Sequence, residues 1–176
     1  AWGLPIDTTE IAMCSPLGDG AAAAILCSEA ALAHFPKAAQ SRAVRIRAST
    51  LSGGKYRRLD EPGLSRIAAD KAYARAGLKP GDMQLAEVHD ATSFCELYQL
   101  EMLRLCDEGQ GGRFVESGAA SLGGRLPVNV SGGLVSKGHP VGATGLSMVY
   151  EMSLQLRGEA GARQVKGASL GLIENG

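Results

Sequence analysis

The sequence has few of the residues that build metal sites or disulfide frameworks. Its 176 residues include four cysteines and three histidines, and no two cysteines form a Cys-x-x-Cys pair. This spacing matches neither the common patterns of zinc ligands nor those of small disulfide-stabilised domains, so we expect no metal site. Reduced thiols are instead typical of a cytoplasmic protein.

An excess of charge of either sign is also absent. The 18 Lys and Arg residues balance the 18 Asp and Glu residues. Nucleic acids and anionic membrane surfaces are held by clustered positive charge, so the sequence predicts neither as a partner. It lacks an apolar run near the roughly 20 residues that a membrane span needs. Residues 1–5 do not have the pattern of a signal peptide.

Glycine, by contrast, is abundant, and most of the 24 glycines stand between periodic segments. Short apolar runs alternate with longer patterns of helical period, which predicts an α/β domain. We expect strands at residues 21–26, 43–48, 85–88, 128–130 and 168–173. Helices are expected at residues 28–34, from Asp60 and Pro62 to Gly77, and at residues 93–105 and 144–157, with residues 107–124 as a surface loop.

The same patterns predict caps and core faces. Ser28 is placed to cap one helix and either Thr92 or Ser93 to cap another, and Gly77 and Pro80 are placed to end a third. The strand at residues 21–26 is expected to be buried. The apolar stripes expected to face the core are Leu64, Ile67, Ala68 and Ala72 in one helix, Phe94, Leu97, Tyr98, Met102 and Leu105 in the next, and Leu146, Val149, Tyr150 and Leu154 in the last.

The chemistry of the sequence concentrates in one glycine-rich loop. Residues 132–145 surround His139 with glycines and lead directly into a helical pattern. Glycine lets the backbone approach a ligand closely, and an imidazole at a helix N-terminus tends to stay neutral. Such a histidine can act as a base or donate a hydrogen bond to a developing oxyanion. The order Ser136-Lys137-Gly138 differs from that of a Walker A loop, which needs Gly-Lys-Ser/Thr.

Two further polar clusters follow predicted strands. They are His89-Asp90-Ala91-Thr92 and Glu174-Asn175-Gly176. Ligands of α/β proteins gather at the carboxyl ends of strands, so we expect these clusters to converge with the His139 loop on one pocket. Each residue also has a structural interpretation: His139 as a loop histidine bonded to a carbonyl, His89 as a core histidine, and Glu174 as an ordinary strand-end carboxylate.

Taken together, four segments resemble the thiolase superfamily. Residues 129–133 running into residues 138–145 are similar to its histidine loop, and residues 18–23 to the last strand of its N-terminal domain. His89-Asp90 stands where thiolases carry the first two residues of Asn-Glu-Ala-Phe, as in the sterol-carrier/lipid-transfer branch. Glu174 stands where they carry the cysteine of Cys-x-Gly-Gly-Gly.

The resemblance implies a thiolase-like α/β fold, C-terminal half only, with a mixed sheet covered by helices. Residues 1–40 would complete an N-terminal domain, and residues 41–176 would form an incomplete C-terminal domain. It implies an acyl-CoA acyltransferase that cleaves or forms a 3-ketoacyl-CoA, with an aromatic or steroid-derived acyl group among the candidates. Coenzyme A would be a substrate, and no bound cofactor is expected.

The resemblance also implies roles for single residues. His139 would activate a nucleophilic cysteine and help bind the thioester oxyanion. His89 would orient an oxyanion-hole water in place of asparagine, and Glu174 would move the proton of the α-carbon in place of the second cysteine. The residues expected to bind substrate are Gly138, Ser136, Gly142 and Asn129.

Partners follow from the same resemblance. The family implies a homodimer and, in some members, a small OB-fold subunit. None of the four cysteines stands in the nucleophile motif, and the chain stops directly after a predicted strand. We therefore expect a fragment that is inactive without an N-terminal half. Two alternatives are a retro-aldolase acting on a β-hydroxyacyl-CoA and a non-catalytic subunit that binds acyl-CoA or a partner.

Overall fold

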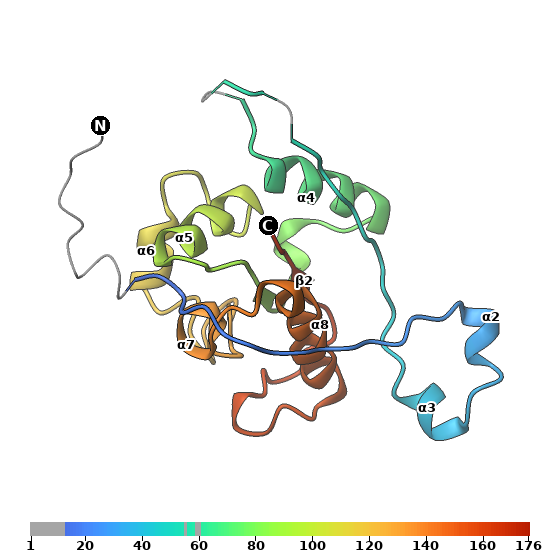
Figure 1. Cartoon of the computed structure of the whole chain (residues 1–176). Helices are drawn as coiled ribbons and strands as arrows, with labels where there is room; N and C mark the ends of the chain where they lie inside the picture. Colours follow the sequence, from blue (N-terminus) through green and yellow to red (C-terminus); the bar gives the residue numbers. More distant parts are fainter. Residues whose placement is uncertain (1–12, 55, 59–60) are drawn as a thin grey trace.

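The computed structural model describes residues 13–54, 56–58 and 61–176. Most helices cluster around a small parallel sheet, as Figure 1 shows, whereas residues 18–28 run out to two short helices and residues 42–54 run back from them. The elements are α2 (Glu29–Leu32), α3 (Lys37–Ser41), α4 (Leu64–Ala76), η1 (Pro80–Asp82), β1 (Ala86–Glu87), α5 (Ser93–Met102), α6 (Gly111–Glu116), α7 (Gly133–Lys137), α8 (Val141–Arg157), η2 (Gly161–Arg163) and β2 (Leu172–Ile173). This mixture confirms the predicted α/β class.

The sheet is short and parallel. Strand β1 pairs with β2 in the register Ala86 to Leu172, and Ala86 also forms a parallel bridge with Val128. Parallel strands end at the same edge of a sheet. The residues that follow β1, β2 and Val128 are therefore brought together, and these are the segments in which the sequence predicts polar chemistry.

Two apolar clusters hold the helices against the strands. In the larger cluster, Tyr73 of α4 packs with Leu100 of α5 and donates its hydroxyl proton to the carbonyl of Leu103 at 2.8 Å. Burial raises the pKa of this tyrosine to about 12. In the smaller cluster, Met152 of α8 packs against Leu85 beside β1. The edge of the sheet that carries the site therefore rests on buried apolar residues from both clusters.

The expected helix ends agree with the structure where they depend on local contacts. Ser28 caps α2 and Thr92 caps α5, each accepting a hydrogen bond from the backbone three residues on. Gly77 ends α4 with a φ of +66°. Helix α4 is preceded by Gly63 as its N-cap, and the expected start at Asp60 lies outside the described residues.

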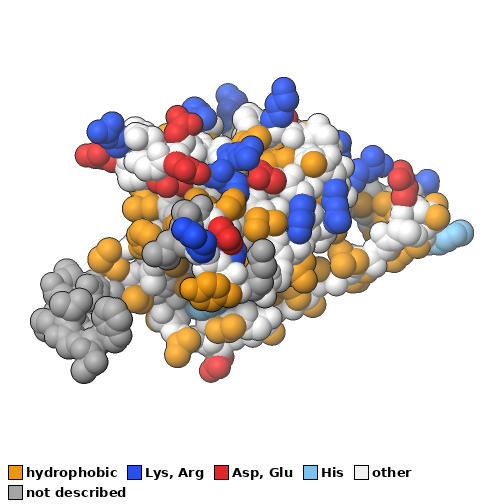
Figure 2. Space-filling view, turned by 90° about the horizontal axis from the view of Figure 1, so that it is seen from above, with side chains coloured by type: hydrophobic (Ala, Val, Ile, Leu, Met, Phe, Trp, Pro, Cys, Tyr) orange, Lys and Arg blue, Asp and Glu red, His pale blue; other side chains and the backbone are white. Residues whose placement is uncertain are grey.

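The prediction that residues 21–26 form a buried strand is wrong. They are extended but exposed, and Ile25 retains 85% of its accessible surface. Residues 43–48 are also extended, without a strand partner in the described part of the chain. Figure 2 shows apolar side chains along the arm that carries these segments. An extended segment becomes a strand only when a neighbour pairs with its backbone, and periodicity says nothing about that neighbour.

The predicted faces of the helices also need correction. Phe94 and Tyr98 on α5 and Tyr150 on α8 are exposed, and Met148 and Met152 of α8 are buried instead. In α4 the buried residues are Ala69 and Tyr73, whereas the predicted stripe is half-buried. Residues 107–124 are not all surface loop, because they contain α6 with its buried Phe114. Each helix here has more than one apolar stripe, so the position of its neighbours selects the face.

No helix in the described ranges is both long and apolar enough to cross a membrane. The described residues also contain no group of three or more His, Cys, Asp or Glu side chains placed to hold a metal ion. The expected domain division at residue 40 stays a prediction, and residues 1–12 of its first part lie outside the described structure.

Candidate active site

His89 and His139 lie side by side at the carboxyl edge of the sheet. Their ring centroids are 4.9 Å apart and the rings meet edge to face at 87°. His89 follows β1, and His139 stands between α7 and α8. The structure therefore brings together the two imidazoles that the sequence places in separate loops.

The backbone and ring of His139 are both fixed. Its N–H donates to the carbonyl of Pro16 at 2.9 Å, and its Nδ1 lies 2.8 Å from the hydroxyl oxygen of the buried Thr144. That hydroxyl donates its single proton to the carbonyl of Pro140 at 3.2 Å. When the hydroxyl donates to Pro140, it accepts from the N–H at Nδ1, and Nε2 is the nitrogen without a proton in that tautomer. The ring of His139 is thus bonded to a hydroxyl, whereas the structural interpretation of this histidine expected a bond to a carbonyl.

Glu174 is the third member of this group. Its Oε2 accepts from the backbone N–H of His89 at 3.2 Å, and its Oε1 accepts from the Ser65 hydroxyl at 3.1 Å. Burial raises the pKa of Glu174, and these two hydrogen bonds and the charge of His89 offset only part of that effect. A carboxyl group with a raised pKa exchanges protons more readily near neutral pH. The Nδ1 atom of His89 is buried without a hydrogen-bond partner among the described residues.

Asp90 links the two histidine loops, a contact that sequence reasoning missed. Its carboxylate is buried, and Oδ1 accepts from the N–H of Leu134 at 2.8 Å, at the start of α7. Gly133 has a φ of +64°, and a Cβ there would collide with the carboxylate. The residue after His89 therefore anchors the helix that leads to His139. The adjacent glycines Gly132 and Gly133 were the signal that something approaches this turn closely.

Glu87 is a second buried carboxylate that sequence reasoning missed. It accepts from the Ser131 hydroxyl at 2.6 Å and from the Ser131 N–H at 3.2 Å. Lys137 donates to the same hydroxyl at 2.8 Å. Burial raises the pKa of Glu87, and Ser131 and Lys137 counter it. The lysine thus stabilises a buried negative charge through a serine, and this bond holds both ends of the loop that contains α7.

The four expected substrate-binding residues lie in different surroundings. Asn129 has a φ of +49° and both ends of its amide are used: Oδ1 accepts from the Val88 N–H at 2.8 Å, and Nδ2 donates to Glu96 at 2.9 Å. Gly138 is buried with a φ of +88°, and Ser136 is exposed on α7. Asn129 is therefore placed to hold the loops together.

Gly142 lines an open cavity of about 320 Å³ next to His139. Residues 140–143, at the start of α8, form one wall of the cavity, and residues 18–22 form the opposite wall. The walls consist mainly of glycine and alanine, and Gly20 faces Pro140 so closely that a Cβ would lie 2.8 Å from the proline ring. Most of the side chains on its surface are therefore small, and backbone groups lie between them.

We predict that Asp90→Ala lowers the free energy of unfolding by about 1–3 kcal/mol, because the N–H of Leu134 loses its buried acceptor. Asp90→Asn keeps an acceptor oxygen and should lose less. Urea unfolding of the two variants checks this order, and the NMR contact between the rings of His89 and His139 should weaken only in the alanine variant. Equal losses in both variants would contradict the anchoring role.

Comparison with known proteins identifies the family. Residues 62–176 match the family described as thiolase C-terminal domain-like. Sterol carrier protein 2 of Homo sapiens is 45% identical over 96% of this chain and 32% of its own length. An acetyl-CoA acetyltransferase of Methanothermobacter thermautotrophicus is 41% identical over 96% of this chain and 44% of its own.

Among solved structures, the chain is similar to one titled Ltp2-ChsH2(DUF35) aldolase, with a TM-score of 0.59 and 28% identity over 67% of this chain and 32% of that one. The chain thus spans about a third of the length of the sterol carrier relatives. Sequence match, fold and the order of the motifs agree. The chain belongs to the thiolase family and carries its C-terminal domain.

Proposed function

We propose that this chain supplies the histidine and carboxylate side of a thiolase-type active site, which forms or cleaves the carbon–carbon bond beside a CoA thioester. The observation that carries the proposal is the edge contact of His89 and His139 at 4.9 Å, with Glu174 bonded to the backbone of His89. Two imidazoles and a carboxyl of raised pKa provide a base, an oxyanion donor and a proton carrier within one cluster.

His139 would serve the acyl-transfer half of the reaction. Its unprotonated Nε2 would take the proton of a cysteine thiol, and the thiolate would then attack the acyl carbon and displace the leaving group. The nucleophilic cysteine is proposed to come from the remainder of a thiolase-length protein. Of the cysteines here, Cys95 accepts a hydrogen bond from Thr92 and serves the cap of α5.

Glu174 would serve the carbon–carbon step. Its carboxylate would remove a proton from the α-carbon of an acyl-CoA, and the C–H electron pair would become an enolate. The enolate carbon would bond to the carbonyl carbon of the acylated cysteine, whose sulfur would leave as thiolate. A ring N–H of His89 could hold the enolate oxygen, while Nε2 of His139 serves the cysteine. Thiolytic cleavage is the same sequence in reverse.

The cavity between residues 18–22 and residues 140–143 would bind the arm of the CoA thioester, meaning the chain between its sulfur and its phosphates. Its volume of about 320 Å³ and its small lining residues suit a narrow, uncharged chain better than a ring system. Backbone N–H and C=O groups at its glycines could bind the amides of such an arm. Asp19 lies on its wall, so the phosphates of coenzyme A would stay outside.

The test is Glu174→Gln in the assembled thiolase that contains this chain. We expect the rate of α-proton exchange in acetyl-CoA to fall by about a hundredfold or more, because the amide cannot accept the proton. In the unmodified protein, the rate should fall as the pH drops through the raised pKa of Glu174, at a higher pH than for an ordinary glutamate. A variant with normal exchange would refute the proposed role.

Stability gives an independent check on the same variant. A glutamate with a raised folded pKa favours the folded state below its unfolded pKa, and that contribution is lost as the pH rises through the folded value. The amide of Glu174→Gln carries no charge to desolvate and can still accept from the His89 N–H. The variant should therefore be at least as stable at neutral pH, so lost activity would not reflect unfolding.

A retro-aldolase is the second candidate, favoured by the likeness to the structure titled as an aldolase. Its reaction on a β-hydroxyacyl-CoA needs a base for the hydroxyl proton and a donor for the enolate, but no acylated cysteine. Replacing the nucleophilic cysteine of the assembled protein by alanine should abolish thiolysis and spare aldol cleavage. Tight acyl-CoA binding without turnover of either substrate would indicate the non-catalytic subunit. The homodimer, the OB-fold partner and the cytoplasmic location stay predictions.

A further inference from the structure

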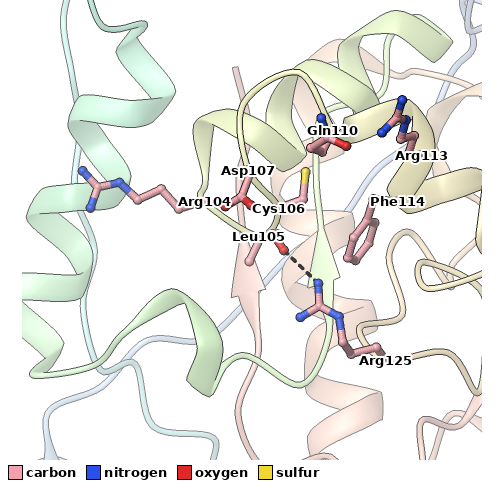
Figure 3. A pocket seen from close by; sticks show the side chains of 8 residues that line it. All are labelled: Arg104, Leu105, Cys106, Asp107, Gln110, Arg113, Phe114 and Arg125. Carbon is pink, nitrogen blue, oxygen red and sulfur yellow. Dashed lines mark hydrogen bonds between the residues drawn. The ribbon is translucent and has the colours of Figure 1, made fainter.

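A second open cavity, of about 390 Å³, lies at the end of α5 away from the histidines. Helix α5 begins at Ser93, just after the His89 loop, and its ten residues span about 15 Å. The cavity is lined by the turn that follows α5, by α6 and by Arg125, as Figure 3 shows. Its ligand is therefore separate from anything bound at the imidazoles.

The lining is cationic although the whole chain has a formal net charge of +0. Arg104, Arg113 and Arg125 line the cavity, and Asp107 is the one carboxylate among its lining residues. Arg104 is already paired with Asp70 at 3.2 Å. Arg113 and Arg125, in contrast, have no carboxylate partner among the residues that the structure describes. The lining therefore carries more positive than negative charge.

Arg125 is also held in place before any ligand arrives. Its guanidinium lies 4.9 Å from the centroid of the Phe114 ring, and its Nη2 donates to the carbonyl of Leu105 at 3.3 Å. Phe114 is itself buried in the core, and in Figure 3 it lies between Arg113 and Arg125. A guanidinium stacked on a fixed ring loses little side-chain entropy when it binds, and its planar set of N–H donors matches the oxygens of a phosphate.

We propose that this cavity binds the phosphate group of a small phosphorylated ligand, held by Arg125, with Arg113 adding positive charge from the other side of the Phe114 ring. The guanidinium of Arg125 would offer N–H donors to phosphate oxygens. Gln110 also lines the cavity and adds an amide donor. Asp107, on the same lining, can accept from a hydroxyl of the ligand.

The proposal is tested on the chain itself at low ionic strength, with inorganic phosphate and adenosine 3′,5′-bisphosphate as probes. We expect saturable shifts of the Nε–Hε NMR signals of Arg113 and Arg125. Arg113→Gln and Arg125→Gln should each weaken binding about tenfold. Arg45→Gln is the matched control, because Arg45 is exposed and pairs with the exposed Glu29. If the bisphosphate binds more tightly than inorganic phosphate, the ligand of the cavity is an organic phosphate. If the two probes bind equally, the ligand is free phosphate.

Cys106 provides a second readout inside the cavity. It is half-buried, and burial and the nearby Glu101 and Asp107 raise the pKa of its thiol. A bound phosphate should slow the alkylation of Cys106, measured by peptide mass spectrometry, and leave that of the exposed Cys27 unchanged. The proposal would be overturned by NMR shifts that do not saturate, or by a loss of binding in Arg45→Gln equal to that in the other two variants. Unchanged alkylation of Cys106 at a saturating concentration of the probe would also overturn it. Arg113→Gln alters an exposed side chain, so it separates binding from folding.

Discussion

Replacement of His139 by alanine is expected to lower thiolysis turnover of the assembled enzyme by about a thousandfold or more. The substitution removes the nitrogen proposed to deprotonate the cysteine, and it removes one donor to the oxyanion. The fold should survive, because the bond of residue 139 to Pro16 is made by its backbone N–H. Steady-state rates with acetoacetyl-CoA and free coenzyme A measure the effect.

His34→Ala is the control for this experiment. His34 is exposed beside the short helix α2, away from the sheet edge that carries the other two histidines. That variant should keep the full rate. If His139→Ala were as active as His34→Ala, the assignment of His139 to the chemistry would be wrong. An intermediate variant, Thr144→Val, should lower the rate less, because it frees Nδ1 and leaves the ring in place.

Gly133→Ala is expected to have the largest effect on stability, a loss of about 3 kcal/mol or more in the free energy of unfolding. Two causes add at this position. The φ of +64° is unfavourable for any residue with a Cβ, and the new atom would lie against the carboxylate of Asp90, 2.9 Å from its Cγ. Urea unfolding followed by circular dichroism measures the loss.

Gly142→Ala is the matched control, since this glycine lies in α8. Apart from its chain neighbours and its own helix backbone, no atom of the described structure lies within 4 Å of a Cβ added there. Alanine there should be neutral or stabilising by up to about 1 kcal/mol. The double variant Gly133→Ala with Asp90→Ala should lose less than the sum of the single variants, because the collision disappears with the carboxylate. Equal stability of Gly133→Ala and Gly142→Ala would show that the close approach of Asp90 is not important for the fold.

Local signals were sufficient to predict several elements of this fold. The caps at Ser28 and Thr92 and the end of α4 at Gly77 depend on hydrogen bonds within one turn or on the freedom of a glycine. Such contacts join residues that are neighbours in the sequence, so their pattern is visible in it. The exposed faces of α5 and α8 were not predictable in this way, because they depend on what packs against each helix.

The order of residues along the chain was enough to show that His89 and Glu174 follow strands, and therefore that they would meet at one edge of a parallel sheet. It also showed that a glycine-rich turn would carry His139 to the start of α8. Packing in three dimensions was needed to establish that Thr144 orients the ring of His139, that Asp90 anchors α7, and that the cationic cavity lies apart from the histidines. Those contacts join side chains that are remote in the sequence or depend on how a ring is turned, and burial then sets their electrostatics. Neither composition nor spacing encodes such distances, because they are fixed by the packing of the whole chain.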